Sequence, residues 1–374
     1  MSGPLTGVRV VEIAGLAPAA FGAMVLADLG ADVLRIDRAS ARDRGVAVPP
    51  GVLDRGRSTI ALDLKDETDL EALHQILESA DVLIEGFRPG VAERLGIGPD
   101  ETRGRNPGLV YARMTGWGQH GPLAARAGHD ITYLALAGAL EPIGHAGERP
   151  VPPLNLVADL GGGGMLLALG VLAALHERQS SGQGQVVDAA MVDGSSLLMT
   201  FVHGMRDAGL WPNPRGENLF DSGAPFYDTY ECADGRFVAV GAVETEFFAE
   251  LLDRLGVADA PEQYEFARWP QLRERLAAAF KQRTRDEWAE VFADSDACAA
   301  PVLSPWEAHE HPHNAQRQAF VDVAGARQPA PAPRFDRTPA AAPLPRNARD
   351  AASMLDSWAV DTALIARMTT RSSR

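Results

Sequence analysis

The feature that most constrains this chain is the alternation of short apolar runs with amphipathic segments up to about residue 115. Val8–Ile13 is a mostly apolar run, typical of a buried parallel strand. Ala17–Leu29 follows with a helical pattern, and Gly30 ends it. Ala31–Asp37 then returns to a strand pattern. This β-α-β order predicts an α/β fold with a parallel, doubly wound sheet.

The same rhythm continues along the chain. Further strands are predicted at Thr59–Leu64, Asp81–Phe87, Leu109–Met114 and Gln185–Met191, with a helix at Asp66–Ser79. Ser40–Arg57 lacks periodicity and predicts a surface loop, whereas Gly161–Gly164 is expected to open a long apolar helix that ends near Glu177.

The second half predicts a smaller α+β domain. Trp211–Ser222 is rich in Pro, Asn and Gly and is typical of a linker. Tyr227–Val243 predicts a hairpin, because Asp-Gly lies between two alternating runs. Helices are expected at Thr245–Leu255, Trp269–Phe280 and Asp286–Phe292, and beyond Gln328 an extended Pro- and Ala-rich segment with a loose tail after Arg367.

Composition excludes several classes of function. The 374 residues include 50 acidic and 35 Lys and Arg side chains, so a net charge of −15 disfavours binding to nucleic acid or an anionic membrane. No apolar run reaches the roughly 18 residues of a membrane span. The start of the chain lacks the basic region of a secretory signal. Two cysteines cannot form a disulfide framework or a Cys-rich metal site, so a cytoplasmic location without a metal is expected.

Four cations follow predicted strands in this acidic chain. They are Arg38, Lys65, Arg88 and Arg94. The carboxyl ends of parallel strands face the ligand crevice of such sheets. Cations gathered there suit a multiply phosphorylated ligand, although each could also be a solvated surface charge. A dinucleotide is disfavoured, because Gly15 stands alone where a Gly-x-Gly-x-x-Gly turn is needed.

Four polar residues are candidates for chemistry, each with an ordinary structural alternative. His129 could be a general base or a structural histidine. Asp159 could be an acid/base or nucleophile beside helix-start N–H groups, or only a helix N-cap. Asn155 could orient a neighbouring side chain. Glu244 could pair with a catalytic histidine, or simply favour the start of its helix.

Several stretches together resemble a known family. They include GVRVVEIAGLAPAAFGAMVLADLGADVLRIDR, ADVLIEGFRPGVAERLG, LVYARMTGWGQHGP, AGHDITYLALAGAL, RPVPPLNLVADLGGGGM and YECADGRFVAVGAVE. In this order they are similar to the α-methylacyl-CoA racemases, a group within the class III CoA-transferases.

The resemblance implies a Rossmann-like large domain, a smaller α+β domain and an interlocked homodimer. The expected boundaries are 1–190 for the large CoA-binding domain, 191–222 for a linker, 223–303 for the small domain, 304–320 for a second linker and 321–374 for a return to the large domain.

The resemblance also implies an acyl-CoA substrate and no separate cofactor, since CoA is part of the substrate. The CoA end is expected near Arg38, Leu62, Asp63, Leu64, Lys65, Gly86, Phe87, Arg88 and Arg94, and the thioester end near Gly128, His129, Asp130, Ile131, Thr132 and Tyr133. His129, oriented by Glu244, and Asp159 would exchange a proton at C2 of a 2-methylacyl-CoA through an enolate. The alternative is a CoA-transferase in which Asp159 forms an acyl anhydride.

Overall fold

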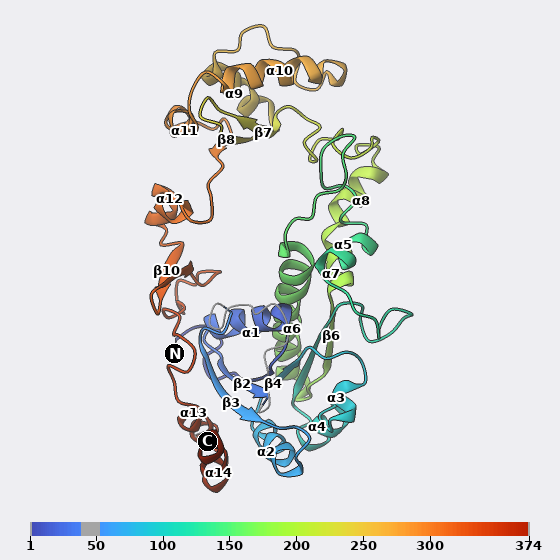
Figure 1. The fold of residues 1–374 in the computed structure, drawn as a ribbon, viewed down its shortest axis with the longest axis vertical. Helices are drawn as coiled ribbons and strands as arrows, with labels where there is room; N and C mark the ends of the chain where they lie inside the picture. Colours follow the sequence, from blue (N-terminus) through green and yellow to red (C-terminus); the bar gives the residue numbers. More distant parts are fainter. Residues whose placement is uncertain (1, 39–52, 373–374) are drawn as a thin grey trace. The chain divides into compact units, whose positions relative to one another are not determined.

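A six-stranded parallel sheet organises the computed structural model, which describes residues 2–38 and 53–372 (Figure 1). The strand order is β3-β2-β1-β4-β5-β6, and every neighbouring pair is parallel. The strands are β1 (Arg9–Ile13), β2 (Asp32–Arg38), β3 (Arg57–Leu62), β4 (Val82–Glu85), β5 (Val110–Thr115) and β6 (Val186–Ala190). Each of the six predicted strands is confirmed, with ends within two residues of the predicted ones. The predicted loop Ser40–Arg57 lies mostly outside the described residues.

Helices connect the strands and cover the sheet. They are α1 (Ala17–Asp28), α2 (Glu67–Glu78), α3 (Val91–Arg94), α4 (Pro99–Arg105), α5 (Asp130–Leu136), the π-helix η1 (Leu156–Met165), α6 (Leu166–Ser181) and α7 (Met191–Leu198). Side chains of β1, β2 and β3 meet α2 in one apolar core. The helices α13 (Ala351–Ser357) and α14 (Thr362–Ser372) join that core beside β3 (Figure 1). The predicted loose tail after Arg367 is therefore wrong as far as Ser372, because α14 is helical to that residue.

The sequence suggested that the four-glycine run opens a helix, but the structure differs. The helix begins earlier, at Leu156, as a π-helix that runs directly into α6. Its glycines allow close helix approach: a Cβ on Gly164 would lie 2.7 Å from the Pro18 carbonyl oxygen of α1. A Cβ on Gly162 would lie 2.8 Å from the Ser195 nitrogen of α7. These glycines therefore serve helix packing, with backbone against backbone.

The continuous helix is longer than the sequence analysis expected of any apolar segment. Leu156–Ser181 spans 26 residues and is long and apolar enough to cross a membrane, by length and composition only. A core helix passes the same test, and α6 contacts both β5 and β6 of the sheet. The sequence count missed this length because the glycines and Asp159 interrupt the apolar run.

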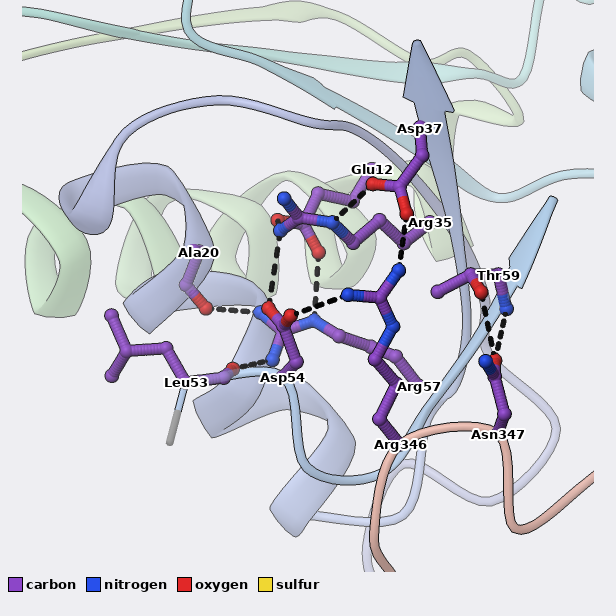
Figure 2. Close-up of polar contacts among 10 residues, drawn as sticks. All are labelled: Glu12, Ala20, Arg35, Asp37, Leu53, Asp54, Arg57, Thr59, Arg346 and Asn347. Atoms are coloured by element: carbon purple, nitrogen blue, oxygen red, sulfur yellow. Dashed lines mark hydrogen bonds and ion pairs between the residues drawn. The ribbon is translucent and has the colours of Figure 1, made fainter. Parts of the chain in front are cut away.

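A buried ion-pair cluster joins the first three strands and reaches β3 at its first residue, Arg57 (Figure 2). Glu12 of β1 accepts hydrogen bonds from Arg57 of β3 at 2.7 Å and from Arg35 of β2 at 3.0 Å. The side chains of Glu12 and Arg57 are both fully buried. Arg57 also donates to the carbonyl oxygens of Ala20 and Leu53. The cluster therefore ties the three strands to α1 and to the chain that enters β3.

The chain after residue 340 joins the same cluster. Arg346 pairs with Asp54 at 3.0 Å and with Asp37, and both acids also pair with Arg35. Asn347 accepts hydrogen bonds from the backbone N–H and the hydroxyl of Thr59, each at 2.8 Å (Figure 2). The C-terminal segment is thus held along β3 by charge as well as by apolar contact.

Contacts divide the chain into two compact units. One comprises Met1–Ala137, Leu154–Leu198 and Ala315–Arg374, and the other Gly138–Pro153 and Met199–Asn314. The boundaries given by the sequence place 138–153 in the large domain, whereas here Arg215 of the second unit donates to the carbonyl oxygens of Glu141 and Glu148. The predicted linker 191–222 contains α7 and the helix α8 (Thr200–Asp207).

The second unit has a three-stranded antiparallel sheet. Its strands are β7 (Tyr227–Glu231), β8 (Phe237–Gly241) and β9 (Ala299–Pro301), and its helices include α9 (Thr245–Leu255), α10 (Trp269–Phe280) and α11 (Arg285–Phe292). The predicted hairpin is confirmed, and Gly235 of its turn has a φ of 77°. The strand β9 escaped prediction because three residues carry too little pattern.

The glycine contacts give a stability prediction. A Cβ on Gly194 of α7 would lie 1.9 Å from the Gly162 carbonyl oxygen, so Gly194→Ala must push two backbones apart. We expect a loss of about 1–3 kcal/mol in the free energy of unfolding, seen as a lower melting temperature. Gly104→Ala in α4 is the control: nothing lies within 4 Å of its Cβ, and it should stabilise by about 0.5–1 kcal/mol. Equal melting temperatures for the two variants would contradict this packing.

Candidate active site

A cavity of about 380 Å³ lies at the carboxyl ends of the first four strands. Its position includes the switch point between β1 and β4, where ligands bind in such sheets. It is lined by Ile13, Ala14, Ile36, Asp37, Arg38, Leu62, Asp63, Leu64, Lys65, Phe87, Val91 and Leu95. Six of the residues proposed for the CoA end line this one cavity: Arg38, Leu62, Asp63, Leu64, Lys65 and Phe87.

The charges of this cavity favour an anionic group. Arg38 and Lys65 are exposed, and neither pairs with a carboxylate within the part of the chain that the structure describes. Asp37, by contrast, is already paired with Arg35 and Arg346. Asp63 accepts the backbone N–H of Lys65 at 3.1 Å. The two cations are therefore free to bind phosphate oxygens, while the nearby acids are occupied.

A buried acid, Glu85, stabilises the turn after β4. Glu85 accepts the N–H of Phe87 at 2.7 Å and pairs with Arg113 at 3.1 Å. Burial raises the pKa of Glu85, although the Phe87 N–H and Arg113 oppose that shift. Of the other predicted CoA contacts, Gly86, Arg88 and Arg94 do not line the cavity, and all three are exposed.

The ring of Tyr133 in α5 packs against Gly116 and Gly128. A Cβ on Gly116 would lie 2.2 Å from the Tyr133 ring, and a Cβ on Gly128 2.5 Å from it. The ring meets Trp117 edge-on, with centroids 4.7 Å apart. Burial raises the pKa of Tyr133 to about 12, with the Asp159 carboxylate adding to the shift and Arg88 opposing it. The phenol is thus neutral near pH 7, and the charges of Asp159 and Arg88 both influence its pKa.

His129 immediately precedes α5 and is exposed. Its backbone N–H donates to the Thr132 hydroxyl oxygen at 3.0 Å, and that hydroxyl donates back to the His129 carbonyl at 2.7 Å. The backbone of His129 is therefore fixed, while its imidazole remains accessible. Ile131, another residue proposed to line the thioester end, is also exposed.

Asp159 is half-buried in η1 with a raised pKa. Burial is the largest cause, and the charge of Asp130 adds to it. The Asn155 amide donates to Asp159 at 3.4 Å and, with the positive charge of His129, opposes the shift. A carboxyl group whose pKa is raised keeps its proton to higher pH, so it can serve as an acid as well as a base.

Asp159 is not an N-cap ahead of the helix, because the helix already starts at Leu156. The backbone N–H groups of Ala158 and Asp159, in the first turn of η1, donate to the Asp130 carboxylate at 2.9 and 2.8 Å. These two N–H groups are therefore engaged by a side chain.

Glu244 belongs to the second unit, where it is the exposed N-cap residue of α9. Its side chain accepts no capping hydrogen bond from α9, but its position at the helix start agrees with the structural alternative that its charge favours the helix dipole. Its negative charge contributes to the raised pKa values of Tyr264 and Cys298, after burial in both cases. The pairing of Glu244 with His129 stays a prediction.

Within the residues described, no group of three or more His, Cys, Asp or Glu side chains forms a candidate metal site. Sequence reasoning missed the apolar wall of the cavity, namely Ile13, Ile36, Val91 and Leu95. Ile13 is the last residue of β1 and Ile36 lies two residues before the end of β2, so the rule that ligands meet strand ends could have found part of the wall.

Comparison with known proteins identifies the family. Residues 5–350 match the description of CoA-transferase family III. The chain belongs to this family. It is 48% identical over 339 residues to the alpha-methylacyl-CoA racemase of Mus musculus, covering 90% of this chain and 87% of the relative. It is 45% identical over 343 residues to the enzyme of that name from Homo sapiens, with the same coverage.

The fold agrees with solved structures of the family. A crystal structure of a CAIB/BAIF family protein from Brucella suis superposes with a TM-score of 0.78 at 25% identity. The match covers 91% of this chain and 95% of that one. The parallel sheet described above is therefore an architecture shared with a known family member.

Proposed function

We propose that this protein is an isomerase that interconverts (R)- and (S)-2-methylacyl-CoA thioesters. The observation that carries the proposal is its identity of 45–48% with two alpha-methylacyl-CoA racemases over 90% of the chain. The site supports it, because His129 and Asp159 lie close enough for the imidazole to influence the carboxyl pKa. The acyl-CoA binds with its phosphates beside Arg38 and Lys65.

The reaction is a 1,1-proton transfer. The thioester carbonyl makes the C2 proton removable, since the resulting charge moves onto the enolate oxygen. One group removes the proton from one face of C2, and the other delivers a proton to the opposite face. His129 serves one face and Asp159 the other, and their roles exchange with the hand of the substrate. The raised pKa of Asp159 lets that carboxyl keep its proton to higher pH than an ordinary aspartate.

Other parts of the proposal concern the setting of this chemistry. Glu244 orients the His129 imidazole, and Asn155 orients Asp159, to which it donates a hydrogen bond. No redox cofactor takes part, because the transfer moves a proton and no net electrons, and we propose no metal. The chain works in the cytoplasm as a homodimer. Large exposed apolar side chains of the first unit support that assembly: Leu156, Met165, Leu169, Leu197 and Leu198.

The alternative is a CoA-transferase that uses Asp159 as a nucleophile. It fits the family description. Treatment with hydroxylamine in the presence of acyl-CoA separates the two, because only a transferase forms an acyl anhydride on Asp159. The racemase identity and the presence of His129 and Glu244 favour the isomerase.

Deuterium exchange tests the proposal. Proton NMR of (S)-2-methylacyl-CoA with the protein in D₂O should show loss of the C2 proton and appearance of the R epimer. His129→Gln should abolish epimerisation and slow C2 exchange about 100-fold for one enantiomer only, since Asp159 still serves the other. The control is His176→Gln, an exposed histidine of α6. Unchanged epimerisation in His129→Gln would remove His129 from the reaction.

The pH dependence follows from the raised pKa of Asp159. The two directions must share one kcat/KM profile, because their ratio is the epimer equilibrium constant. Its acid limb should lie above the usual aspartate value of about 3.9. Asn155→Ala removes a hydrogen bond that lowers this pKa, so its acid limb should move to higher pH. A limb that stays in place or moves to lower pH would contradict the assignment.

Substrate binding gives a separate prediction. Arg38→Ala should raise KM about 10-fold and leave kcat within about twofold, since a binding contact far from C2 acts equally on ground and transition states. Arg38→Lys, which keeps the charge, is the control and should retain much of the affinity. If Arg38 holds the 3′-phosphate, a 3′-dephospho-CoA ester should bind wild type and Arg38→Ala equally. An unchanged KM in Arg38→Ala would place the phosphate elsewhere.

A further inference from the structure

Asp130 follows His129 in the chain, yet its surroundings are different. His129 is exposed, whereas Asp130 is 7% exposed. It is the first residue of α5. Its carboxylate turns away from its own helix and toward η1, which begins 26 residues later in the sequence at Leu156.

The carboxylate makes two hydrogen bonds to the start of η1. Its Oδ2 accepts the N–H of Ala158 at 2.9 Å and that of Asp159 at 2.8 Å. We call this pair of hydrogen bonds the tie between Asp130 and η1. Ala158 is fully buried, so its end of the tie lies in the core. The second oxygen, Oδ1, is buried and has no hydrogen-bond partner among the described residues. A buried acid that leaves one oxygen unpaired calls for an explanation beyond simple solvation.

Other aspartates of this chain cap helices in the usual local way. Asp66 accepts the N–H groups of Thr68 and Asp69 in the helix it precedes. Asp350 accepts the N–H of Ser353 in the same manner. Asp130 differs because it caps a helix remote in sequence, at the turn that carries Asp159.

These contacts form a short structural connection between His129 and Asp159, the two groups of the proposed reaction. The Thr132 hydroxyl fixes the His129 backbone at both its N–H and its carbonyl. The next residue, Asp130, binds the backbone N–H of Asp159 itself. His129 and Asp159 are therefore joined through one side chain, and a displacement of that side chain moves one group relative to the other.

We propose that Asp130 is a positioning residue, whose carboxylate fixes the placement of Asp159 relative to His129 for proton transfer at C2. This inference rests on the proposed function. Two groups that work on opposite faces of one carbon tolerate little movement, since a misplacement of about 1 Å can cost about 100-fold in rate. Asp130 does not touch the reacting carbon in this role, and it leaves the CoA cavity, whose lining it does not join, unchanged.

Two variants separate the tie from a general need for an acid. Asp130→Ala removes both hydrogen bonds, so C2 exchange in D₂O should fall about 100-fold for both enantiomers, with KM within about threefold. Asp130→Asn keeps an oxygen that can accept both N–H groups, so it should recover to within about 10-fold of wild type. A rise in KM with unchanged kcat, or equal losses in the two variants, would overturn the proposal.

Asp350→Ala is the matched control, since it also removes an acid that accepts a backbone N–H at a helix start. It should lower the melting temperature without changing C2 exchange. A second measurement does not depend on turnover: amide hydrogen exchange of a peptide covering 156–165, followed by mass spectrometry. Faster amide exchange there in Asp130→Ala, and not in Asp350→Ala, supports the tie, and unchanged exchange overturns it. Failure of wild type to exchange the C2 proton would instead reject the proposed function.

Discussion

The buried carboxylate of Glu12 is the constraint on which the rest of this structure depends. A carboxylate that is shielded from solvent must be paired with a cation. Removing one partner of such a buried pair lowers the free energy of unfolding by about 3–5 kcal/mol. Glu12 obtains its partners from two other strands, Arg35 of β2 and Arg57 of β3. The ion pairs that neutralise Glu12 therefore hold β1, β2 and β3 together, and the carboxyl ends of these three strands line the cavity.

The C-terminal segment gains its place from this arrangement. Arg346 completes the charge balance by pairing with Asp37 and Asp54. Asp37 lines the cavity beside Arg38, and its pairing leaves the Arg38 charge uncompensated. A segment more than 300 residues away in sequence thus shapes the charge beside the cavity without lining it.

Much of the fold could be predicted because its signals are local. The parallel strands show as apolar runs, and the hairpin turn shows as Asp-Gly. The cavity residues Arg38 and Lys65 could be found because strand ends meet at one edge. The π-helix could not be predicted, since glycines next to an apolar run favour a turn and only contact with Pro18 and Ser195 shows their packing role.

The tie between Asp130 and the start of η1 escaped prediction for a related reason. It joins residues 28 and 29 apart in the chain, and no local pattern records such a contact. The family resemblance implies only that Asp130 lines the thioester end. Similarly, residues 138–153 belong with the second unit through contacts of Arg215, which only the folded chain displays. Long-range polar contacts are therefore where sequence reasoning fell short.

In the proposed reaction, His129 and Asp159 serve opposite faces of one carbon. A crystal structure with a bound, non-exchangeable analogue of 2-methylacyl-CoA tests it most directly. We expect C2 to lie between the two side chains, with the imidazole on one face and the carboxyl on the other, each about 3–3.5 Å from it. An analogue seated with both groups on the same face of C2, or with Asp159 directed at the thioester carbonyl carbon as a nucleophile, would contradict it.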